Sequence, residues 1–142
     1  MSLNLIKLSA GTESVEDLKR WNREHLRHLR AVGHKGPRFH TTRMVPKRMD
    51  ELLDGGSIYW VIKGQIQARQ KLVGIEPFTD RAGIRRCRLM LDDKLVPTQW
   101  QPKRPFQGWR YLKQEDAPLD LNEGDEPMPA ALRADLSELG LL

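Results

Sequence analysis

Ser57-Ile58-Tyr59-Trp60-Val61-Ile62-Lys63 gives the clearest strand signal in the chain. It is rich in β-branched and aromatic residues, and such side chains fit the pleated surface of a sheet. Gly55-Gly56, directly before it, is typical of a helix end, because glycine readily adopts the positive φ found there. We therefore expect a short helix over 46–53, with Pro46 in its first turn, to lead into this strand.

Upstream, the pattern predicts a strand over 3–8, a helix over 15–32 and a second strand over 38–44. Ser14 followed by Asp17 resembles a capping box at the start of the helix. An apolar stripe at three- and four-residue spacing should face the core, and it consists of Leu18, Trp21, His25, Leu29 and Val32. The other side is basic and carries Lys19, Arg20, Arg23, Arg27 and Arg30.

Downstream, closely spaced strands are expected over 66–75, 84–91 and 95–100, and a short one ends at Leu112. A hairpin loop at 80–83 and a turn at Asp92-Asp93-Lys94 should separate the first three. Pro97 places the third at a sheet edge, because proline cannot donate a ladder hydrogen bond.

Short strands with tight turns are typical of a strongly curved, mostly antiparallel sheet or a small barrel. We therefore expect an α+β fold with flanking helices, and a single domain over 1–121. Residues 122–142 are expected to form an acidic linker and a short C-terminal helix over 130–139, with Leu132, Leu136 and Leu139 on one side.

The charge of the chain is unevenly distributed. Residues 1–113 carry 23 Lys and Arg against 11 Asp and Glu, whereas residues 114–142 carry 1 Arg against 8 acidic residues. A basic body is the electrostatic signature of a polyanion binder, and solvated arginines would give the same composition. There is no membrane-length apolar run, no signal-peptide pattern, and only one cysteine, Cys87. These features favour a cytoplasmic protein without a disulfide.

Long segments of the chain form a recognisable set. They are His40-Thr41-Thr42-Arg43-Met44, Pro46-Lys47-Arg48, Leu52-Leu53-Asp54-Gly55-Gly56-Ser57, Tyr59-Trp60-Val61-Ile62-Lys63-Gly64, Arg69-Gln70 and Arg104-Pro105-Phe106-Gln107-Gly108-Trp109-Arg110-Tyr111-Leu112. Together they resemble a bacterial family catalogued as domain of unknown function 1489, over about residues 3–121. This resemblance implies no particular activity.

The short helix that ends in Gly55-Gly56, followed by a strand and a basic strand pair, is also similar to the layout of PUA-like barrels, which include the ASCH and EVE families. That resemblance implies a small barrel that binds RNA or modified nucleobases. Gly56, Lys63 and Arg69 would take three positions of the ASCH signature, whose Glu has no counterpart between Lys63 and Arg69.

The residue patterns indicate no cofactor, no metal and no complete catalytic site, so they favour a role other than catalysis. All four histidines, His25, His28, His34 and His40, fall in one short stretch without an ordered carboxylate or thiol. No phosphate-binding glycine motif is present. The adjacent Asp92 and Asp93 suit a turn better than a paired-acid site.

Basic residues interleaved with aromatic ones are what remains, and they point to RNA or a related polyanion. Cationic side chains neutralise phosphates, and aromatic or guanidinium planes stack on unpaired bases. Trp60 and Trp109 are also candidates for the core. The predicted nucleic-acid-binding residues are Arg43, Lys47, Arg48, Lys63, Arg69, Arg104, Trp109 and Arg110.

Two alternatives stay open at this point. The first is a metal-independent enzyme acting on RNA or a nucleotide, with His40 as acid or base and Arg43 and Lys63 stabilising charge on phosphorus. The second is a protein-interaction domain that binds a partner through its C-terminal helix, or whose acidic tail covers the basic body and restrains binding.

Overall fold

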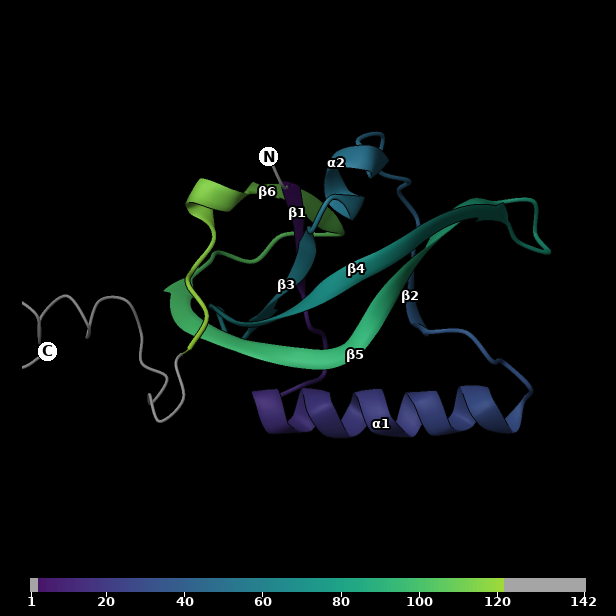
Figure 1. Ribbon diagram of the computed structural model, residues 1–142, viewed down its shortest axis with the longest axis horizontal. Helices are drawn as coiled ribbons and strands as arrows, with labels where there is room; N and C mark the ends of the chain where they lie inside the picture. The colour runs from purple at the N-terminus through teal and green to yellow at the C-terminus, as the bar shows by residue number, and fades with distance from the viewer. Residues whose placement is uncertain (1–2, 122–142) are drawn as a thin grey trace, which may run out of the picture.

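A mixed sheet of six strands dominates the computed structural model, which describes residues 3–121 (Figure 1). The strands follow the order β2-β5-β4-β3-β1-β6; β1 and β3 are parallel, and the other neighbouring pairs are antiparallel. The strands are β1 (Leu3–Leu8), β2 (Arg38–Thr42), β3 (Ser57–Ile62), β4 (Gln65–Thr79), β5 (Arg85–Pro102) and β6 (Trp109–Lys113). The helices are α1 (Val15–Ala31), α2 (Met49–Leu53) and a 3-10 turn over Gln114–Asp116.

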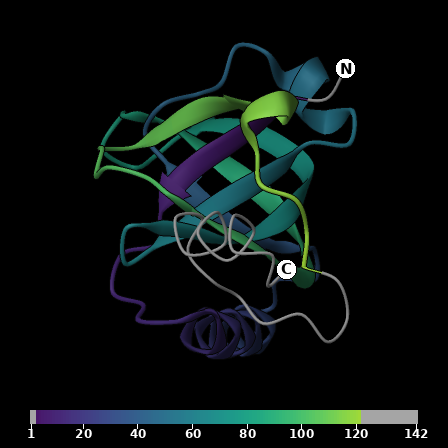
Figure 2. The ribbon, with the colours of Figure 1, turned by 90° about the vertical axis from the view of Figure 1, so that its left-hand side faces the viewer.

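The expected α+β class and the mostly antiparallel sheet are confirmed, whereas closure into a barrel is not observed. Figure 2 shows the sheet strongly curved, and β2 and β6 are its two edges. Register shifts in β3–β4 and β4–β5 contribute to this bending, because an extra residue on one strand kinks the ladder. The helix and linker expected over 122–142 lie outside the described residues.

The predicted turn at Asp92-Asp93-Lys94 is wrong, because β5 runs through it as one strand. Gln70 of β4 pairs with Leu95, and Leu72 pairs with Leu91. Three residues of β5 therefore stand opposite one residue of β4, and the polar side chains form an exposed bulge instead of a turn.

Pro97 lies in the half of β5 that β2 does not reach, since β2 pairs only with residues 87–91. Beside Pro97, the segment that follows the 3-10 turn makes a bridge between Thr98 and Asp120. The Pro97 carbonyl accepts a hydrogen bond from the Leu121 backbone N–H at 3.0 Å. β5 is an inner strand of the sheet, but its half around Pro97 has β4 as a partner strand on one side and only the isolated bridge to Asp120 on the other.

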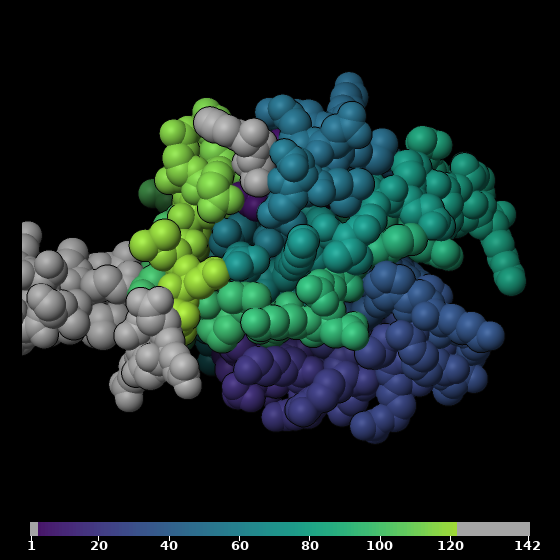
Figure 3. Space-filling model, in the orientation of Figure 1, coloured from purple at the N-terminus to yellow at the C-terminus, as the bar shows by residue number. Residues whose placement is uncertain are grey.

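Helix α1 begins as predicted, because Ser14 Oγ accepts a hydrogen bond from the Asp17 backbone N–H at 3.1 Å. Its buried side, however, differs from the predicted stripe. Trp21 and Val32 are 48% and 67% exposed. The helix is rotated so that it turns another row of residues toward the sheet, and the buried members of this row are Leu18, Asn22 and Leu29. Figure 3 shows α1 lying along β5.

The short helix begins later than predicted, at Met49, and its glycine-rich end positions β3. Gly55 has a φ of +84°, as the predicted helix stop requires. Gly56 is needed for a close approach, because a Cβ there would lie 2.2 Å from the Leu3 carbonyl oxygen and 2.3 Å from that of Leu52. No helix within residues 3–121 is long and apolar enough to cross a membrane.

Candidate ligand cleft beneath helix α1

The inward faces of β1 and β2 are polar where these strands pass under α1. Leu3 and Leu5 on β1 belong to the main core, and strand alternation places Lys7 on the same face. On β2, the residues of the inward face are Arg38, His40 and Thr42. Cationic and polar side chains thus occupy positions on a face that is mainly apolar elsewhere in the sheet.

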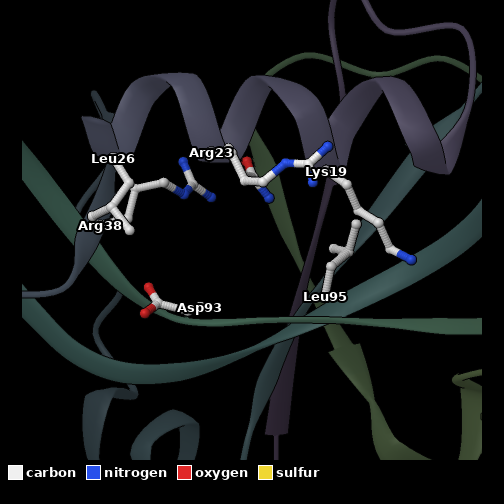
Figure 4. Close-up of a pocket in the computed structure, with 7 residues that line it drawn as sticks. Lys19, Arg23, Leu26, Arg38, Asp93 and Leu95 are labelled. Atoms are coloured by element: carbon white, nitrogen blue, oxygen red, sulfur yellow. The ribbon is translucent and has the colours of Figure 1, made fainter. Parts of the chain in front are cut away.

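Two adjoining cavities open at this place, and both are lined by Asn22 and Arg38. The first has a volume of about 260 Å³ and lies between α1 and β5, with Arg23 of the helix on one side and Asp93 of the strand on the other (Figure 4). The second has a volume of about 240 Å³, and its walls include Lys7, His40 and Trp60. We call the two cavities together the α1 cleft.

Arg38 is held rigidly in the wall of the cleft. It is 3% exposed, and its guanidinium donates to the side-chain oxygen of the fully buried Gln70 at 3.2 Å. The same oxygen accepts from the Trp60 indole N–H at 3.0 Å, and the Gln70 amide nitrogen donates to the Asp92 carbonyl at 3.2 Å. Burial lowers the pKa of Arg38 to about 10, partly offset by Asp93, so the guanidinium stays charged at neutral pH.

Asn22 brings an unsatisfied amide into the cleft. The residue is 8% exposed, and neither its amide nitrogen nor its amide oxygen has a hydrogen-bond partner in the described part of the chain. A buried amide without a partner costs on the order of 1–3 kcal/mol, so such groups are uncommon in folded proteins. An Asn on the buried side of α1 between Leu18 and Leu29 is therefore a feature that packing does not explain.

His40 adds a second unpaired polar atom, because its Nε2 is buried without a partner among residues 3–121. Its ring meets that of Trp60 edge-on, with centroids 5.4 Å apart. Burial, reinforced by the positive charges of Lys7 and Arg38, lowers the pKa of His40 to about 4. The imidazole is therefore neutral at pH 7 and can either donate or accept a hydrogen bond at Nε2.

Lys7 completes the positive side of the cleft. Its ammonium group makes no hydrogen bond or ion pair with any residue of the described chain. Burial lowers the pKa of Lys7, and this desolvation favours an anionic partner. The second cavity thus combines two cations, a neutral imidazole and an amide that has one donor group and one acceptor.

The chain matches a known family model over most of its length. The model described as "Protein of unknown function (DUF1489)" matches residues 5–142. The chain belongs to the DUF1489 family. No curated protein and no solved structure matches it. Three of the segments that resemble the family contain residues of this site. His40 and Trp60 line the second cavity, and Gln70 accepts hydrogen bonds from Arg38 and Trp60.

Three of the basic residues predicted from the DUF1489 sequence to bind nucleic acid are already engaged in ion pairs. The pairs are Arg48 with Glu51, Lys63 with Glu13 at 2.5 Å, and Arg69 with Asp120 at 2.7 Å. The Arg69–Asp120 contact is bidentate, and Arg69 also donates to Ser57 Oγ at 3.0 Å. These three cations are thus partly neutralised by the DUF1489 chain itself.

Trp109 does not offer a free stacking face in the DUF1489 structure, because it is 6% exposed and belongs to the main core. Its indole N–H donates to the Met44 carbonyl at 3.0 Å. Tyr111, two residues further on β6, accepts hydrogen bonds from the backbone N–H groups of Lys47 and Arg48 at 3.0 and 3.2 Å. Residues 44–48 therefore pack against β6. The buried Trp109 cannot stack on a base at the predicted binding surface.

The remaining predicted residues of the DUF1489 chain are exposed. Arg110 donates to the Gln107 carbonyl at 2.6 Å and lies over the Phe106 ring. Arg43 and Arg104 make no ion pair with a described residue. Within residues 3–121, no side-chain hydrogen bond or ion pair connects Lys63 or Arg69 with the predicted residues on β6, Trp109 and Arg110. His40 lies in the cleft, and the cations that affect its pKa there are Lys7 and Arg38, not Arg43 or Lys63.

Sequence reasoning did not select Lys7, Asn22 or Arg38 of this DUF1489 protein, although each leaves a signal. Lys7 is in phase with the core residues Leu3 and Leu5. Asn22 is four residues after Leu18 and seven before Leu29, so a helical period places it on the same side. Among residues 3–121, no group of three or more potential metal ligands converges.

Proposed function

We propose that this DUF1489 protein binds RNA and that the α1 cleft, with the basic side of α1 around it, is the contact surface. The observation that carries the proposal is the state of the cations there. Lys7, Arg23 and Arg38 make no ion pair within the described residues and line one cleft. Arg48, Lys63 and Arg69 are paired, and the unpaired Arg43 and Arg104 do not line it.

A cation without a carboxylate partner can bind a phosphate without first breaking an ion pair inside the protein. Arg23 lines the first cavity from α1 without an ion pair among the described residues, so it can contact a phosphate at the helix while Arg38 contacts it from β2; Lys19 beside it is 3.7 Å from Glu16. Trp21, next to Asn22 on the helix, is 48% exposed and lies under the Arg38 guanidinium, 5.6 Å from ring centroid to Cζ. Trp21 therefore exposes aromatic surface to solvent, whereas Trp109 is buried.

The first experiment is a fluorescence-anisotropy titration with single-stranded RNA, duplex RNA and DNA, each at two salt concentrations. Phosphate neutralisation makes log Kd depend linearly on log salt, with a slope of roughly 0.7 per phosphate contact on a single strand. We expect salt-sensitive binding with a preference for RNA. Absence of binding at low salt would refute the proposal.

Two matched variants localise the surface, because each removes one exposed arginine and changes the net charge equally. Arg23→Gln should weaken RNA binding and reduce the salt slope by roughly 0.7. Arg48→Gln, whose arginine is paired with Glu51 beside β6, should bind almost as the parent does. Equal losses in the two variants would mean that only the overall charge matters.

His40 does not suit the acid or base role that the enzyme alternative assigns to it. A general base works best with a pKa near the working pH, and the pKa of His40 is about 4. The interaction-domain alternative depends on residues 122–142, which lie outside the described part of the chain. Deletion of these residues tests it.

A further inference from the structure

The α1 cleft contains more than a basic surface needs. Phosphate binding at a surface requires exposed cations, but Asn22, Arg38 and the Nε2 of His40 are buried. Both atoms of the Asn22 amide are unsatisfied although the residue lines both cavities. A side chain that served packing alone would be apolar at this position, between Leu18 and Leu29.

From this arrangement we infer that the α1 cleft is a site for a small planar ligand with one negative charge and an amide-like edge, in which a C=O adjoins an N–H. The Asn22 amide is the complement of such an edge, since its oxygen accepts where the ligand donates and its nitrogen donates where the ligand accepts. This inference does not depend on RNA binding, and it names a ligand that the surface proposal does not require.

The negative charge follows from the balance of charges in the cleft. Lys7 and Arg38 both line the second cavity, which has no carboxylate among its lining residues. The first cavity has one, Asp93, whose charge raises the pKa of Arg38. Lys19 of the first cavity is paired with Glu16, and Arg23 is exposed to solvent. The charges left to be matched are those of the half-buried Lys7 and of Arg38, which Asp93 partly offsets, or about one positive charge.

The planar shape follows from the walls. The second cavity lies between the helix, with Leu18 and Trp21, and the sheet, with Trp60, and its volume is about 240 Å³. Pockets of this kind hold a flat ring by apolar contact and orient it by a few polar groups. The Gln70 side chain fixes Arg38 and Trp60 in position, so this wall is formed before a ligand arrives.

Four compounds separate the parts of the inference. Orotate carries a lactam edge and a carboxylate, uracil carries the edge alone, and benzoate carries a planar anion alone. Uridine 5′-monophosphate carries the edge on a phosphate-bearing nucleotide. We expect orotate or uridine 5′-monophosphate to quench Trp fluorescence and to shift the Asn22 side-chain amide signals in NMR spectra, and uracil and benzoate each to bind about tenfold more weakly or worse.

Variants of the full chain test whether the cleft is responsible. Asn22→Leu removes the amide while preserving volume, so it should weaken binding about tenfold or more while leaving the protein equally or more stable. Lys7→Met keeps the apolar stem and removes the charge, and it should also bind about tenfold more weakly. Lys47→Met removes an exposed lysine outside the cleft and should bind as the parent does.

The outcomes are distinct. Binding of the free compounds identifies a small-molecule site; binding of a short oligouridylate to the same residues, without binding of the free compounds, identifies a nucleotide within a strand. Equal affinity for orotate and benzoate, or unchanged affinity in Asn22→Leu, would refute recognition of an amide edge. If no compound binds at millimolar concentration, the inference fails, while the salt-dependent RNA titration still decides the surface proposal separately.

Discussion

His40→Gln should make the stability of the protein less sensitive to acid. The pKa of His40 is about 4 in the folded chain, against about 6.5 for histidine in an unfolded one. Protons therefore bind preferentially to the unfolded state as the pH falls below 6.5. The stability that depends on neutral His40 is fully present above pH 6.5 and is lost as the pH approaches 4.

The magnitude follows from the two pKa values. Between pH 7 and pH 5, the preferential protonation of unfolded His40 removes about 2 kcal/mol from the free energy of unfolding. Carboxylates with lowered pKa values, such as Asp80 and Asp120, lose their contribution at lower pH. His25 also has a lowered pKa, but it is present in both proteins and cancels in the comparison.

Urea unfolding at pH 7 and pH 5 measures this difference directly. The parent should lose about 2 kcal/mol more than His40→Gln on this change of pH. An NMR titration of the imidazole signals provides an independent check, since the folded protein should show no His40 transition near pH 6.5. Equal losses in parent and variant would refute a buried, neutral His40 and with it the described electrostatics of the cleft.

Four further outcomes follow from contacts outside His40. Gly56→Ala should prevent soluble folding, because its Cβ would meet two carbonyl oxygens at 2.2 and 2.3 Å, whereas Gly36→Ala, which meets only a side chain at 3.4 Å, should give normal soluble yield. Trp109→Phe should lower the urea-derived free energy of unfolding by about 1–2 kcal/mol through the lost volume and the lost hydrogen bond to Met44. Asp120→Asn should cost at most about 1 kcal/mol, and less in high salt, because its pair with Arg69 is partly exposed to solvent. Deletion of residues 122–142 removes 5 acidic residues and 1 Arg and should tighten RNA binding in the anisotropy assay if the tail restrains the basic body; unchanged affinity would argue against that role.

Local signals predicted the elements that depend on local chemistry. The β-branched and aromatic run over 57–63 forms β3, and Ser14 caps α1 through the Asp17 backbone N–H. The bulge at 92–94 could not be predicted in this way, because it exists only through the pairing of β5 with β4. Asp-Asp-Lys has turn chemistry, but the long ladder on both sides outweighs it.

The candidate site was harder to predict because it depends on tertiary orientation. Charge and the resemblance to PUA-like barrels selected Lys63 and Arg69, and the fold pairs both with acidic residues. The rotation of α1 decides that Asn22 faces the sheet and Trp21 does not. Curvature of the sheet brings His40 of β2 against Trp60 of β3, although β5 and β4 lie between these strands in the sheet order.

The position of the cations distinguishes a site from a basic composition. Arginines that serve solubility lie on the surface, where solvent and nearby carboxylates compensate them, as Arg48 and Arg69 illustrate. Arg38 is instead 3% exposed and oriented by a fully buried glutamine, and the unpaired Lys7 faces the same cavity. Burying these charges, together with the unsatisfied Asn22 amide, opposes folding. Lys7, Asn22 and Arg38 all line the second cavity, so a ligand that satisfies them there would recover this cost on binding.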